Sequence, residues 1–129
     1  MKHIAICENH LYSKAYSKGA KYVGKGVVIY VLKDQKANLL KKAHPDKVKI
    51  NRIGLTVTKK IGGAVIRSRV KRILREGLRQ TEKTNNVKKG YLIVLVARPS
   101  AVNLKSTDIA KDIEKAFHKL NLIDNSVSD

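Results

Sequence analysis

The stretch KKIGGAVIRSRVKRILREGLR, residues Lys59 to Arg79, decides how this chain folds and indicates what it binds. Eight of its 21 positions are Lys or Arg, and its only acid is Glu76. Gly62 and Gly63 break the preceding strand pattern, and helical spacing then separates an apolar face from a basic one. The stretch predicts a helix from about residue 64 to about residue 80 that packs on a sheet and turns its basic side toward a polyanion. The residues assigned to packing are Val65, Ile66, Val70 and Ile73.

Three strands are predicted around this helix. Val27 to Leu32 is a β-branched run, and Arg52 to Lys59 alternates between apolar and polar positions. Tyr91 to Ala97 is nearly continuously apolar, which is typical of a strand buried on both faces.

Two further helices complete the prediction. A short helix over Glu8 to Lys18 ends at Gly19, and a last helix begins with Ser106 or Thr107 as its cap. The chain is predicted to be one domain over residues 1–129, with its core at about 8–120, a polar loop over 33–49 and a frayed tail over 124–129.

The charge of the chain points to a polyanion partner. It carries 28 basic and 10 acidic residues, a formal charge of +18 and a pI near 10.2. Residues 1–80 have a balance of +16 and residues 81–129 a balance of only +2, so the binding surface is expected in the first two thirds.

Several classes of site are disfavoured. The only cysteine is Cys7, which excludes an internal disulfide, and no ligand spacing indicates zinc. The four histidines are scattered, and no nucleophile is paired with a base, so the chain is not expected to cut a substrate by itself. No apolar run is long enough to span a membrane, and we expect a cytoplasmic protein.

The order of residues from Lys59 to Glu76 resembles the signature of the bacterial ribonuclease P protein subunit, K-K-x-G-x-A-V-x-R-N-R-x-K-R-x-x-R-E. Every specified position matches except Ser68, where the family has Asn. Leu11 to Gly19 resembles the family's first helix, and residues 52–58 and 91–99 resemble the strands on either side of the motif.

The resemblance implies an α+β fold, an α/β sandwich in which helices pack on a mixed sheet. It also implies a left-handed βαβ crossover through the basic helix, as in the second domain of a related small-subunit ribosomal protein. Periodicity alone would favour the common right-handed connection.

The resemblance also implies a function. The chain would be the protein subunit of ribonuclease P, which binds the catalytic RNA and the 5′ leader of precursor tRNA while the RNA, with its Mg²⁺, removes the leader. No membrane and no obligate protein partner are expected. The RNA-binding residues would be Lys59, Lys60, Arg67, Ser68, Arg69, Lys71, Arg72 and Arg75. The leader cleft would be lined by Tyr12, Tyr16, Tyr30, Thr56 and Thr58.

Alternatives to this interpretation stay open. A basic helix is commonly no more than a solvated surface, and tyrosines at helical spacing commonly pack at the edge of a core. A ribosomal or RNA-chaperone protein would suit the same charge and fold. A basic helix lying on anionic membrane is less consistent with the sequence, because this helix has no Trp or Phe to anchor it.

Overall fold

The computed structural model describes residues 3–6, 9–33 and 51–123, where five strands form one mixed sheet in the order β1-β4-β5-β3-β2. The central strand β5 runs parallel to β4 and antiparallel to β3. The strands are β1 (His3–Ala5), β2 (Ala20–Val23), β3 (Val27–Lys33), β4 (Asn51–Thr56) and β5 (Tyr91–Ala97).

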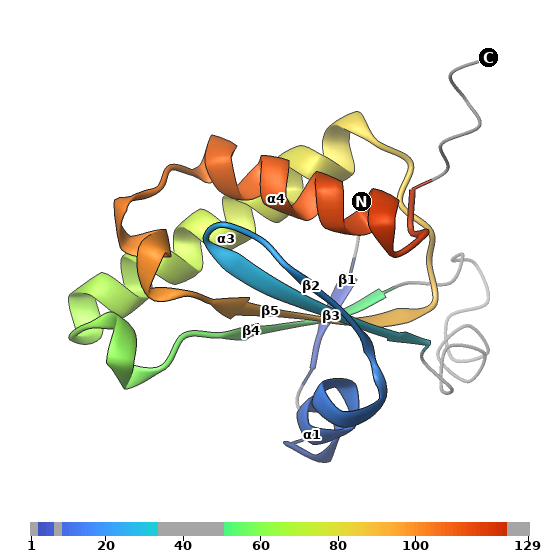
Figure 1. Ribbon diagram of the computed structural model, residues 1–129, viewed down its shortest axis with the longest axis horizontal. Helices are drawn as coiled ribbons and strands as arrows, with labels where there is room; N and C mark the ends of the chain where they lie inside the picture. Colours follow the sequence, from blue (N-terminus) through green and yellow to red (C-terminus); the bar gives the residue numbers. More distant parts are fainter. Residues whose placement is uncertain (1–2, 7–8, 34–50, 124–129) are drawn as a thin grey trace.

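Helices cover both faces of this sheet. Figure 1 shows α3 and α4 side by side on one face and α1 on the other. The helices are α1 (Asn9–Lys18), α3 (Ala64–Thr84) and α4 (Ser106–Lys119), with 3-10 turns η1 (Lys59–Ile61) and η2 (Pro99–Asn103). The predicted α+β fold with a mixed sheet is confirmed, and the parallel pair β4 and β5 is joined through α3. The hand of this crossover stays a prediction.

The main core lies between the sheet and the pair α3 and α4. Alternate residues of β3 point into it, as period-two alternation requires, and Phe117 of α4 is a fully buried member. Other members are Val27, Ile29, Val31, Ile53, Ile93, Leu95, Val70, Leu74, Leu78, Ile109 and Ile113.

A smaller core lies under α1 on the opposite face. Leu11 and Ala15 of α1 pack there against Leu92 and Val94 of β5, together with Ile6. Both faces of β5 are therefore buried, which confirms the prediction from its continuous apolar run.

Close packing fixes α3 against α4. A Cβ at Gly77 would lie 2.7 Å from Cγ2 of Ile109, so only glycine lets the two helices approach this closely. One turn later, the buried Thr81 donates to the carbonyls of Gly77 (3.0 Å) and Ala110 (3.2 Å). These contacts carry the helix to Thr84, beyond the end predicted from the apolar pattern.

Two predictions about α3 and α4 are wrong. Val65 and Ile66 were assigned to packing but are 84% and 39% exposed, because the first turns of α3 extend past the sheet and core contact begins only at Val70. Ser106 and Thr107 do not cap α4. The N-cap is Lys105, and its N–H donates to the Asp108 carboxylate at 2.9 Å.

Other differences concern short or unpatterned segments. The sequence did not predict β1 or β2, which have three and four residues. The predicted strand over residues 52–59 ends earlier, at Thr56, because the chain then turns into η1. The predicted loop over 33–49, Cys7 and the tail over 124–129 lie largely or wholly outside the described residues.

The turn between β2 and β3, residues 24–26, is fixed from three sides. The buried Asp112 of α4 accepts from the N–H of Gly26 at 2.8 Å. Arg98 donates from Nη1 to the carbonyl of residue 24 at 2.6 Å, and the Ser100 hydroxyl donates to the carbonyl of residue 25. The turn is thereby held against both α4 and η2.

Candidate nucleic-acid interface

One edge of the sheet gathers the residues predicted to bind RNA. Because β4 and β5 are parallel, their carboxyl ends lie at the same edge. η1 follows β4 and η2 follows β5, and the two turns contact each other there. Arg69 of α3 donates from Nη1 to the Val102 carbonyl of η2 at 3.2 Å, so the first turns of α3 belong to the same edge.

The predicted basic residues form an exposed face over η1 and the first half of α3, called the basic face below. Lys59, Lys60, Ser68, Arg69, Arg72 and Arg75 are exposed, and Arg67 and Lys71 are half-buried. The first acid of α3 is Glu76, whose carboxylate is bonded to Arg79. The first three turns of the helix therefore present positive charge without an acidic neighbour on the same helix.

Two arginines of the basic face are more constrained than the sequence indicated. The Nε of Arg67 is buried and has no hydrogen-bond acceptor within the described part of the chain. Arg69 uses one N–H group for its hydrogen bond to the Val102 carbonyl. Because a guanidinium has five N–H donors and the side chain is exposed, the other donors can still bind a ligand. Both side chains thus lie partly against the protein before any ligand arrives.

On the face of the sheet that α1 covers, three tyrosines cluster where the leader cleft was predicted, and this cluster is called the aromatic groove below. The rings of Tyr16 and Tyr30 meet edge to face with centroids 5.0 Å apart, and Tyr12 lies 6.5 Å from Tyr16. Tyr16 is 42% exposed, whereas Tyr12 and Tyr30 are half-buried against the smaller core. Tyr12 and Tyr30 thus also have the packing role left open by the sequence, and Tyr16 is the most exposed of the three tyrosines.

Strand β4 lies against two of these tyrosines. A Cβ at Gly54 would lie 2.6 Å from the Tyr12 ring, so the glycine makes room for that ring. The hydroxyls of Thr56 and Tyr16 are hydrogen-bonded at 3.0 Å, which brings two predicted groove residues together. Thr58 lies past the end of β4, where its carbonyl accepts from the N–H of Ile61 at 3.0 Å. No described contact joins Thr58 to the tyrosines.

The aromatic groove and the basic face meet at this edge. Tyr16 contacts Thr56, the last residue of β4, and the basic face begins three residues later at Lys59. Tyrosine rings stack on unpaired bases, while Arg and Lys bind phosphates. The geometry therefore suits two segments of nucleic acid that converge at one edge of the protein.

One basic residue of this edge was not predicted. Arg98 follows β5 directly, is exposed, and donates to the turn between β2 and β3. The sequence does show a basic residue directly after the apolar run of β5. Placing it at this edge requires knowing that β5 is parallel to β4, which the sequence pattern does not give.

The side chains at this edge do not suit a divalent cation. Mg²⁺ takes oxygen ligands, chiefly carboxylates and phosphates, whereas the basic face offers cations. Among residues 3–6, 9–33 and 51–123, no group of three His, Cys, Asp or Glu side chains is placed to hold a metal ion. Over the same ranges, no helix has the length and apolar character to cross a membrane.

Comparisons with known proteins agree on one family. The Ribonuclease P family profile matches residues 1–121. The ribonuclease P protein component of Clostridium acetobutylicum is 36% identical over 123 residues, covering 95% of this chain and 93% of the relative. That of Dehalococcoides mccartyi strain 195 is 33% identical over 95% of this chain and 90% of its own length.

Solved structures show the same fold. The Staphylococcus aureus RNase P protein superposes with a TM-score of 0.72 at 22% identity, covering 95% of this chain and 100% of that one. The Thermotoga maritima protein gives 0.65 at 17% identity, covering 92% and 97%.

Proposed function

Because this chain belongs to the ribonuclease P protein family, we propose that it binds the catalytic RNA of ribonuclease P and the 5′ leader of precursor tRNA. In this proposal the RNA carries the catalytic groups and holds the Mg²⁺ needed to remove the leader, in the cytoplasm. The observation that carries the proposal is the junction of the aromatic groove with the basic face at one edge of the sheet.

The basic face is assigned to the catalytic RNA. Its arginines can bind phosphates through two N–H groups and stack on exposed bases, whereas its lysines act as point charges. Arg67 supports the assignment, because a buried donor without an acceptor is costly and a small movement toward a phosphate would satisfy it. Each phosphate neutralised also releases counterions, so binding should weaken steeply with salt.

The aromatic groove is assigned to the leader. A single-stranded leader can stack its bases on tyrosine rings, and this contact tolerates any sequence because every base has a π face. Tyr16 is best placed for it, since it is the most exposed of the three rings and its hydroxyl is held by Thr56. The leader would then run beside the catalytic RNA, where the positive charge reduces repulsion between the two strands.

Tyr16→Ala tests the leader assignment in the reconstituted holoenzyme, with Tyr16→Phe as the matched control. Losing one stacked base costs about 1–3 kcal/mol, so Tyr16→Ala should weaken binding of leader-bearing precursor tRNA at least about fivefold. Mature tRNA has no leader and should bind unchanged. Tyr16→Phe keeps the ring and loses only the bond to Thr56, so it should stay close to the parent. Equal weakening of both tRNAs, or a lower melting temperature as the sole effect, would exclude the leader assignment.

A further inference from the structure

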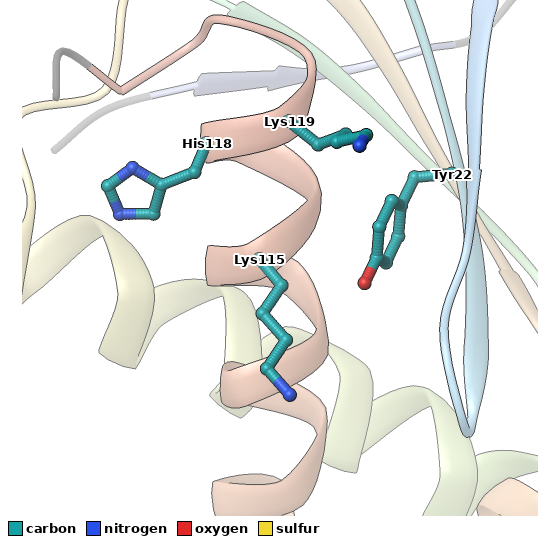
Figure 2. Close-up of a pocket in the computed structure, with 4 residues that line it drawn as sticks. All are labelled: Tyr22, Lys115, His118 and Lys119. Carbon is teal, nitrogen blue, oxygen red and sulfur yellow. The ribbon is translucent and has the colours of Figure 1, made fainter.

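A second basic and aromatic pocket lies between α4 and the edge strand β2. It has a volume of about 480 Å³ and is lined by Tyr22, Lys115, His118 and Lys119. Figure 2 shows Lys115 and Lys119 on the side of α4 that faces the Tyr22 ring, while the His118 ring extends from the other side of the helix. Neither the predicted binding residues nor the proposed function uses this pocket.

The pocket and the aromatic groove lie on opposite faces of the sheet. Tyr22 is paired with Ile29, whose side chain is buried in the main core under α4. Lys21 is paired with Tyr30, whose ring packs on the smaller core under α1. Directly opposite residues of paired strands share a face, so Tyr22 and Tyr30 point to different faces. A nucleic-acid segment in this pocket is therefore distinct from one in the groove.

Within the described part of the chain, no acid of α4 forms an ion pair with the lysines of the pocket. The three acids of α4 are all engaged elsewhere. Asp108 accepts from the N–H of Lys105, Asp112 from Gly26, and Glu114 from Nδ2 of Asn85 at 3.1 Å. Lys115 and Lys119 are exposed, and within the described part of the chain neither ammonium group has an ion pair.

The spacing of the lysines suits a chain of phosphates. Lys111, Lys115 and Lys119 are four residues apart in succession on α4, and all three are exposed. Residues four apart lie about 5–6 Å from each other on one helix face, which is of the order of the step between successive phosphates of a nucleic-acid strand. Because Lys111 continues the row beyond the pocket, the row fits a strand better than a single nucleotide.

From this arrangement we propose that the pocket binds one nucleotide of a single-stranded RNA segment. The base lies against the Tyr22 ring, and its flanking phosphates lie on Lys115 and Lys119. The pocket volume is within the range of sites that hold small molecules, so it admits a nucleotide. This site is separate from the two assigned to the catalytic RNA and the leader, and it does not depend on those assignments.

The proposal is tested by NMR titration of the isotope-labelled full chain with a ten-nucleotide oligouridylate. The expected result is saturable shifts at Tyr22, Lys115 and Lys119. Lys115→Gln with Lys119→Gln should abolish them and lower the salt dependence of binding by about 1.4 in log–log slope, for two phosphates of a single strand. The control pair Lys83→Gln with Lys105→Gln removes the same charge at exposed positions outside the pocket and should leave the shifts intact.

Further measurements distinguish base stacking from charge attraction, and binding of a strand from binding of a free nucleotide. Tyr22→Phe should keep binding at the pocket, and Tyr22→Leu should weaken it at least about fivefold, because only the first keeps an aromatic face. Inorganic phosphate should give no comparable shifts, and uridine monophosphate should bind more weakly than the oligonucleotide. The proposal is overturned if the pocket does not respond, if inorganic phosphate reproduces the shifts, or if the monophosphate binds as tightly as the strand. Shifts at Tyr16 and Arg75 report separately on the groove and the basic face, so failure of one assignment is distinguishable from failure of the other.

Discussion

Asp112→Ala should loosen the turn between β2 and β3 without unfolding the protein. The Asp112 carboxylate is 6% exposed and accepts from the N–H of Gly26 at 2.8 Å. Removing it forfeits a bond to a charged group and leaves a buried N–H without an acceptor, which costs about 1.5–3 kcal/mol. Asp112→Asn keeps an oxygen in place and should cost less, about 0.5–1.5 kcal/mol, because only the charge is lost. Two other side-chain hydrogen bonds and a backbone bond from the N–H of Arg98 to the Gly26 carbonyl still hold the turn, so the fold should survive.

Urea unfolding with hydrogen exchange measures this effect. With a slope of about 2 kcal/mol per molar urea, a loss of about 2 kcal/mol lowers the midpoint by about 1 M. Amide exchange at Gly26 should accelerate in the Asp112→Ala protein more than exchange in β5. Glu114→Ala removes an exposed acid of the same helix and should change stability by less than about 0.5 kcal/mol. The reasoning is refuted if Asp112→Ala is as stable as the parent, or if the Asn variant is as damaged as the Ala variant.

Three further substitutions test the packing and the basic face. Gly77→Ala gains about 1 kcal/mol of helix propensity, but it places a Cβ 2.7 Å from Ile109, and overpacking of this kind costs about 1–3 kcal/mol. Calorimetry should therefore show a net loss of stability, and a more stable variant would contradict the tight approach of α3 and α4. Arg75→Ala should reduce the dependence of catalytic-RNA binding on salt concentration by about one phosphate contact. Lys83→Ala, at the far end of α3, is the control, and an equal effect of that substitution would mean that the helix acts only through net charge. Ser68→Asn restores the family's amide at an exposed site and should keep or modestly tighten RNA binding in a titration at fixed Mg²⁺; a tenfold loss would show that Ser68 is matched to its own RNA.

Periodicity predicted the elements with long, strong patterns. The apolar run of β5 was assigned with its observed bounds, and the basic helix with its observed start. Strands β1 and β2 were not predicted, because segments of three or four residues are too short to show a clear alternation of apolar and polar side chains. The prediction for Val65 was wrong for a different reason. Spacing defines the faces of a helix but not where the sheet beneath it ends.

The candidate sites divide in a similar way. Helical spacing placed Tyr12 and Tyr16 on one face, and the family resemblance added Tyr30. The contact between Tyr16 and Tyr30 depends on how α1 packs over β3, which no local pattern encodes. Tyr22 and the α4 lysines were not linked at all, because they are 93 or more residues apart and meet only through the undetected edge strand.

The most direct test of the central claim is cleavage of precursor tRNA at low salt by three samples: this protein alone, a ribonuclease P catalytic RNA alone, and the two together, each with Mg²⁺. The account predicts no cleavage by the protein alone and efficient removal of the 5′ leader by the mixture, at a rate above that of the RNA. Loss of this stimulation at high salt should follow, because the contact is electrostatic. Specific cleavage by the RNA-free protein, or a mixture no more active than the RNA, would contradict the account.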